Sequence, residues 1–136
     1  MFETFDHTAD LGLRIRAADL DTLFVEAARA LFSVIVDNPE AIQPAEMLEV
    51  HIAGERDDDL LFDWLRELLY RFDGEHRLFS RFEAHRGESG LSSKAWGEPY
   101  DPERHQLGHE VKAITYHGLR VEKTGDGWLA EVIVDI

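Results

Sequence analysis

The order of the sequence patterns predicts an α+β fold: strand, helix, strand, helix and then a run of strands. Two segments carry apolar side chains at the three- and four-residue spacing of amphipathic helices, whereas most of the remainder alternates or turns. The length of 136 residues fits one domain with a sizeable core. We therefore expect a single domain, residues 1–136, in which two helices pack on one side of a mainly antiparallel or mixed sheet.

Both expected helices have start and stop signals. Asp19 or Asp21 can cap the first helix, and Asn38-Pro39 ends it. The apolar stripe of this helix consists of Leu20, Leu23, Phe24, Ala27, Leu31, Val34 and Ile35. Three aspartates at 57–59 open the second helix. They suit the free N–H groups and the dipole of a first turn better than they suit a metal site. Gly74 is expected to end this helix.

The other segments are typical of strands, turns and one polar loop. Two prolines and many polar residues define the loop, and glycines mark the turns. In order, the pattern predicts an irregular entry at 6–12, strands at 13–18, 46–54, 77–87, 91–97, 110–116 and 119–123, a loop at 98–108, a turn at 124–127 and a last strand at 127–136.

The last strand is the element around which we expect the chain to be organised. Both of its faces are partly apolar, which is typical of a central strand. It ends on Asp135 and Ile136, so a side-chain carboxylate and a terminal carboxylate lie one residue apart. Two acidic groups held by a strand in this way favour a bound cation.

Charge and composition exclude several classes of function. The formal net charge is -14, from 28 acidic and 14 basic residues, and would repel a phosphate backbone. A divalent cation or a basic protein surface is the better partner, although many proteins are acidic only for solubility. There is no cysteine, no apolar run of membrane-spanning length and no signal-peptide pattern. We expect a cytoplasmic protein with no membrane association.

No complete catalytic motif is present. His105 and His109 are four residues apart, but the proline and glycines around them argue against the helix that would align two zinc ligands. The serines lack the pattern of a nucleophile elbow, and no glycine-rich loop precedes Lys and Ser or Thr. Carboxylates remain as the candidate functional groups.

These carboxylates fall near the two ends of the chain. Asp6 and Asp10 lie in the irregular N-terminal stretch, and Asp135 and Ile136 lie at the other end. Because chain termini often lie close together, Asp10, Asp135 and the terminal carboxylate could converge. An oxygen-only site would suit Ca²⁺, Mg²⁺ or Mn²⁺. The alternative is that Asp6 and Asp10 only cap turns.

Several blocks, in order along essentially the whole chain, resemble the archease family. The N-terminal Asp-His-Thr-Ala-Asp-Leu-Gly and the later Glu-Val-Lys-Ala-Ile-Thr-Tyr-His together carry the resemblance. The segments that match are 6–12, 60–70, Gly97-Glu98 with Asp101 and His105, 110–117 and 132–136.

The resemblance implies an archease-like two-layer fold and a protein that activates an RtcB-type RNA ligase. Archeases promote guanylylation and multiple turnover of that ligase, which joins RNA ends in tRNA splicing and RNA repair. They are protein cofactors and not enzymes, and they meet RNA only through the ligase. The acidic surface agrees with a partner whose active site is basic.

The resemblance also implies a set of site residues. The metal site of the family, usually described as calcium-binding, corresponds to Asp10, Asp135 and Ile136; Asp6, His7 and Lys112 are further functional positions. Two alternatives remain open. One is a metal-dependent phosphoesterase or other hydrolase that uses the same carboxylates, and the other is a chaperone-like interaction module.

Overall fold

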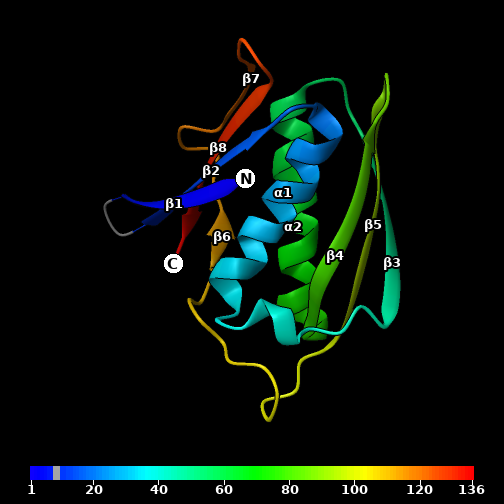
Figure 1. Ribbon diagram of the computed structural model, residues 1–136, viewed down its shortest axis with the longest axis vertical. Helices are drawn as coiled ribbons and strands as arrows, with labels where there is room; N and C mark the ends of the chain where they lie inside the picture. Colours follow the sequence, from blue (N-terminus) through cyan, green and yellow to red (C-terminus); the bar gives the residue numbers. More distant parts are fainter. Residues whose placement is uncertain (8–9) are drawn as a thin grey trace.

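The computed structural model describes residues 1–7 and 10–136, and the side chains of Asp6 and His7 lie outside what it describes. Strands flank a pair of central helices on both sides (Figure 1). The elements are β1 Phe2–His7, β2 Asp10–Ala17, α1 Leu20–Ile35, a short 3₁₀ helix Pro39–Ala41, β3 Glu46–Ala53, α2 Asp57–Glu75, β4 Arg77–Arg86, β5 Gly90–Pro99, β6 Ala113–Ile114, β7 Arg120–Lys123 and β8 Trp128–Asp135.

The α+β prediction is confirmed, but the strands form two sheets where one was expected. A five-stranded sheet has the order β1-β2-β8-β6, with β7 also paired to β8, and a three-stranded sheet has the order β3-β5-β4. All pairings between the described strands are antiparallel. The helices lie between the two sheets, so they are covered on two sides rather than on one (Figure 1).

The buried surface of helix α1 explains why two sheets cover it. Ala28 and Phe32 lie outside the predicted apolar stripe, yet both are fully buried, so the buried face is wider than the stripe. The Phe32 ring lies edge-on to Phe79 and stacked on Phe82, with centroids 5.8 and 6.0 Å apart. Both partners belong to β4. An apolar arc wider than one stripe therefore packs α1 against a sheet on each side.

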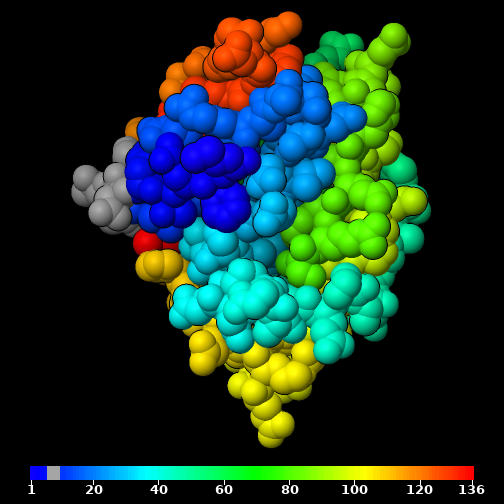
Figure 2. Space-filling model, in the orientation of Figure 1, coloured from blue at the N-terminus to red at the C-terminus, as the bar shows by residue number. Residues whose placement is uncertain are grey.

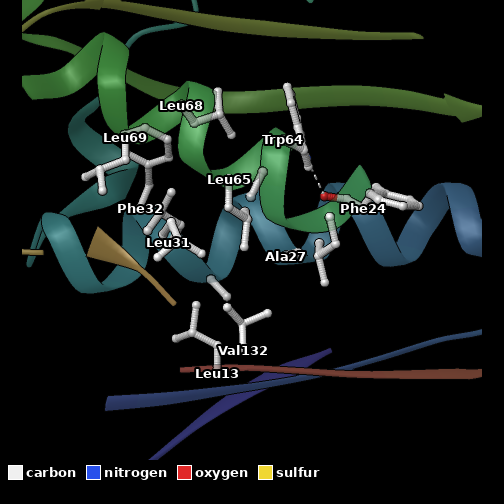
Figure 3. Close-up of a cluster of buried hydrophobic side chains, with 14 of the residues drawn as sticks. Leu13, Phe24, Ala27, Leu31, Phe32, Trp64, Leu65, Leu68, Leu69 and Val132 are labelled. Carbon is white, nitrogen blue, oxygen red and sulfur yellow. Dashed lines mark hydrogen bonds between the residues drawn. The ribbon is translucent and has the colours of Figure 1, made fainter. Parts of the chain in front are cut away.

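Helix α2 lies against α1 and ends later than expected. The indole N–H of its fully buried Trp64 donates to the carbonyl of Phe24, at 3.0 Å, and joins the two helices (Figure 3). Gly74 does not end the helix, which runs to Glu75. Instead His76 takes the left-handed conformation, with φ of 54°, and its N–H donates to Phe72 O at 2.9 Å. A non-glycine residue provides the C-cap here.

The N-terminal prediction was wrong in part, because a strand was missed. Residues 2–7 form β1, a partner of β2, and the expected irregular stretch at 6–12 is mostly strand; residues 8 and 9 lie outside the described residues. The alternation in β1 is weak, as is common at the edge of a sheet. Its Phe5 ring covers Gly12, where a Cβ would lie 2.2 Å from a ring atom. A larger residue at this point in β2 would displace the Phe5 ring.

The later segments follow the predicted order with different bounds. The predicted strand at 110–116 shrinks to β6, and β5 extends through Glu98 and Pro99 into the predicted loop. No helix in the described part of the chain has the length and apolarity to cross a membrane.

Candidate metal site at the end of strand β8

Strand β8 is central, as predicted, and its end brings distant residues together. In the β2–β8 ladder Asp10 lies directly opposite Asp135, and Leu11 lies opposite Val134. On the other side of β8, Ala113 of β6 pairs with Asp135. The sequence suggested that Asp10 and Asp135 could converge, and the register places them as neighbours.

The two aspartates share the outer face of the five-stranded sheet. Val134, Val132 and Leu13 are fully buried. Val132 and Leu13 point to the helices (Figure 3), so the residues that alternate with them along β8 and β2 point outward. Directly opposite residues of an antiparallel pair have Cβ atoms about 5 Å apart, and like charges at that separation repel. Both aspartates are half-buried. Two carboxylates this close together can share one hard cation.

Ile136 and Lys112 lie at the same end of the sheet. Ile136 is half-buried directly after Asp135. The N–H of Lys112 donates to Asp135 O at 2.7 Å, while the lysine as a whole is exposed. Lys112 also borders a shallow depression of about 390 Å³, with Phe62, Arg66, Leu69, Tyr70, Asp73, Ala113 and Ile114. The hydrogen bond therefore places the backbone of Lys112 beside Asp135, whereas the depression that Lys112 borders is lined by residues of α2.

Another carboxylate on this outer face, that of Glu131, is held by two arginines. Glu131 accepts hydrogen bonds from Arg14 Nε at 2.6 Å and from Arg120 Nε at 2.7 Å. Burial alone would raise the pKa of Glu131, but the bonds from Arg120 and Arg14 outweigh it, so the pKa lies below its ordinary value. Glu131 is thus neutralised within the sheet and is a poor candidate for a metal ligand.

The donor chemistry at the end of β8 fits a hard cation in part. Among the described residues, no three His, Asp or Glu side chains are grouped so that they could hold a metal ion. Asp10 and Asp135 supply two carboxylates, and Ile136, the position of the predicted third donor, follows Asp135 directly. The backbone of His7 pairs with Asp10, but the predicted Asp6 and His7 side chains lie outside the description.

The family model that describes the archease protein family (MTH1598/TM1083) matches residues 2–136. The chain belongs to the archease family. It is 43% identical to the protein archease of Pyrococcus abyssi and 42% identical to that of Methanopyrus kandleri. Each alignment covers 99% of this chain, and 98% and 99% of the respective relative.

Two solved structures share this archease fold. The solution structure of protein 1598 from Methanobacterium thermoautotrophicum is 37% identical, has a TM-score of 0.86 and is matched over 98% of its length and 99% of this chain. The crystal structure of a Thermotoga maritima archease, described as a possible chaperone, has a TM-score of 0.67. That protein is 23% identical and matches over 98% of its own length and all of this chain, so the likeness shows the fold alone.

A second polar cluster surrounds Glu98, and the residue chemistry of the sequence did not predict it. Glu98 is 6% exposed and accepts from Arg104 Nη2 at 2.5 Å and from the N–H of Gln43 at 2.7 Å. His105, 2% exposed, accepts at Nδ1 from Asp101 N–H at 2.9 Å. Its Nε2 therefore carries the proton and donates to Glu98 at 2.9 Å.

This cluster has a structural role. Arg104 foremost, then Gln43 and His105, outweigh the effect of burial and lower the pKa of Glu98 to about 2. Both ring nitrogens of His105 are bonded within this cluster, so the ring is not free to ligate zinc. The family blocks include Glu98, Asp101 and His105, and they were the only signal in the sequence for this group.

Proposed function

We propose that the protein is a metal-binding activator of an RtcB-type RNA ligase, promoting guanylylation and multiple turnover in tRNA splicing or RNA repair. Membership of the archease family supports this proposal. The observation that carries it further is the register that sets Asp10 opposite Asp135 at the end of β8. The fold alone would not require two acidic side chains to face each other there.

Asp10, Asp135 and the carboxylate of Ile136 would hold the metal. Carboxylate oxygens suit Ca²⁺. Mg²⁺ and Mn²⁺ accept the same donors, and the smaller Mg²⁺ requires a stricter octahedral arrangement. The bound ion would supply positive charge to an otherwise strongly acidic edge. The backbone N–H of Lys112 holds the end of β8 by donating to Asp135 O, and its exposed side chain is proposed to contact the partner.

The proposed partner is the ligase itself. A net charge of -14 favours a basic protein surface, and an active site that binds RNA and GTP is of that kind. Contact with RNA is proposed to occur only through the ligase, and no membrane is involved. Both proteins would act in the cytoplasm.

Adding this protein to its cognate ligase is expected to increase the rate of ligase guanylylation and the number of turnovers for each ligase molecule. The measurement uses labelled GTP for the first step and RNA ends with 3′-phosphate and 5′-hydroxyl groups for the second. A variant with Asp126→Ala, in the turn before β8, is the matched control because that exposed aspartate lies at the opposite end of the strand. Unchanged guanylylation and turnover would contradict the proposal.

The alternatives give different results in related assays. Metal-dependent phosphoesterase turnover by the isolated protein would favour a hydrolase that uses the same carboxylates. The Thermotoga relative is described as a possible chaperone, and that reading predicts suppressed aggregation of unrelated clients without an effect on the ligase. Stimulation of the ligase in the absence of either activity would favour the activator.

A tag at the C-terminus is expected to weaken metal binding more than the same tag at the N-terminus. Residues added after Ile136 replace its carboxylate with an amide, which removes one charged oxygen donor. Residues added before Met1 leave all three proposed donors intact. Calcium titration calorimetry of the two tagged forms and of the untagged chain measures the difference, and equal affinities would rule out the terminal carboxylate as a ligand.

A further inference from the structure

Strand β3 forms an open edge of the three-stranded sheet. It pairs with β5 alone among the described strands, in an unbroken register from Glu46 opposite Gly97 to Ala53 opposite Gly90. Figure 1 shows β3 at the outer margin of this sheet. The other edge strand, β4, is interrupted by a register shift between Phe79 and Arg81. A regular edge without proline or a bulge is a template for another strand.

The backbone of β3 alternates between its partner and the open edge. The N–H of Gly54, just after β3, donates to Ser89 O at 3.0 Å, and hydrogen-bonded pairs recur at every second residue of an antiparallel ladder. Val50 and the other even-numbered residues therefore bond to β5. The β4–β5 turn supports this assignment. The N–H of Gly87 donates to Gly90 O at 2.9 Å, so the even-numbered residues of β5 bond to β4 and the backbone groups of its odd-numbered residues face β3. The N–H and C=O groups of Glu49 and His51 consequently point outward from the edge.

An acidic and a basic side chain lie next to each other along this edge. The Glu49 and His51 side chains are 53% and 67% exposed on the outer face of the sheet, and they lie 3.9 Å apart between Oε1 and Nε2. On the inner face Val50 is buried, while Leu48 and Ile52 are half-buried. Met47, 49% exposed, adds apolar surface to the outer face.

We propose that β3 pairs antiparallel with β3 of a second copy of this chain, with the two-fold axis at Val50. In this register Glu49 of each copy faces His51 of the other, and the outward N–H and C=O groups of both residues form hydrogen bonds across the interface. Leu48 faces Ile52 and Met47 faces Ala53, so apolar surface is covered on both faces. The three-stranded sheets then join into one continuous sheet across the dimer.

Charge complementarity selects this register over its neighbours. Moving the axis to Glu49 keeps the backbone phase but sets two glutamates directly opposite each other, which is unfavourable. Moving it to His51 sets two histidines opposite each other and leaves both glutamates without a basic partner across the interface. The axis at Val50 instead forms two Glu49–His51 pairs, because the interface is isologous.

Single cysteines test the register, because the chain contains none of its own. At the axis the two Val50 residues form a non-hydrogen-bonded pair with Cα atoms about 4.5 Å apart, which suits a disulfide. Two Glu49 residues lie diagonally, about 7–8 Å apart, which is too far. Under mild oxidation Val50→Cys is expected to give a covalent dimer and Glu49→Cys is not. The reverse pattern, or no dimer with either variant, would overturn the proposal.

Charge reversal tests the same interface without a covalent bond. Sedimentation equilibrium over a concentration series is expected to show dimers of the natural chain, weakened at least about tenfold in His51→Glu, where four acidic groups meet. Adding Glu49→Lys to that variant restores opposite charges and should recover most of the affinity. Glu83→Lys, on β4 of the same sheet, is the matched control and should behave as the natural chain.

Three results of that experiment would overturn the assignment. They are a natural chain that stays monomeric throughout the series, a double variant as weak as His51→Glu alone, and dimers that none of the β3 substitutions affects. Circular dichroism of each variant separates loss of association from loss of fold.

Discussion

Asp10→Ala and Asp135→Ala are each expected to abolish stimulation of the ligase and to lower calcium affinity about 100-fold or more. Each substitution removes a direct carboxylate donor, and loss of even an outer-shell partner of a metal costs roughly 10- to 100-fold in affinity. The fold should survive, because both residues are half-buried at strand ends and neither belongs to the hydrophobic core. Calorimetric titration with Ca²⁺ and the ligase turnover assay measure the two effects.

The comparison is made with Asp126→Ala, which removes the same charge from the turn before β8. It should bind calcium and stimulate the ligase as the natural chain does. Stimulation that persists in both Asp10→Ala and Asp135→Ala would show that the acidic pair has no role in activation. Full stimulation with lost metal binding would separate the two functions and contradict a metal-dependent activator.

Glu98→Ala is expected to lower the free energy of unfolding by about 3 kcal/mol, which is the usual cost of breaking a buried ion pair from one side. It removes the acceptor of the Gln43 N–H and of the buried His105 Nε2–H, together with the partner of Arg104. For a domain of this size the midpoint of thermal unfolding should fall by roughly 10 °C. Differential scanning calorimetry measures it, with Glu83→Ala, an exposed glutamate of β4, as the control.

The effect of Glu98 should also depend on pH. Its folded-state pKa of about 2 lies below the ordinary 4.5, so the folded state favours the carboxylate. The stabilisation is therefore complete above about pH 4.5 and is lost as the pH falls through about 2, a total of about 3 kcal/mol for this difference in pKa. The gap in stability between the natural chain and Glu98→Ala should narrow over that window. A gap that stays constant down to pH 2 would mean that the carboxylate charge is not the source of the effect.

Local patterns were sufficient where an element is specified by its own residues. The bounds of α1 match the predicted stripe because its apolar spacing and the Asp19 cap, which accepts from Thr22 N–H at 2.8 Å, both lie within the segment. The end of α2 could not be predicted in the same way. Gly74 is the stronger stop signal, but the contacts of His76 with the last turn decide where the helix ends.

Pairing between segments that are far apart along the chain was harder to predict from the sequence. Weak alternation concealed β1, which pairs with β2 from Phe2 to His7 and sets Phe5 opposite Gly12. Phe32 lies outside the stripe recognised on α1, so its contacts with β4 could not indicate that a second sheet covers the helix. The Glu98 group likewise draws its partners from separate segments, including the N–H of Gln43.

By itself, the sequence determined the α+β class, the two helices, a central last strand and the supply of carboxylates at its end. The tertiary structure decided that the strands form two sheets around the helices and that Asp10 lies directly opposite Asp135. The physical reason is that the hydrophobic period of a segment depends on its own residues. The register between two strands is instead set by which side chains pack together across the whole chain.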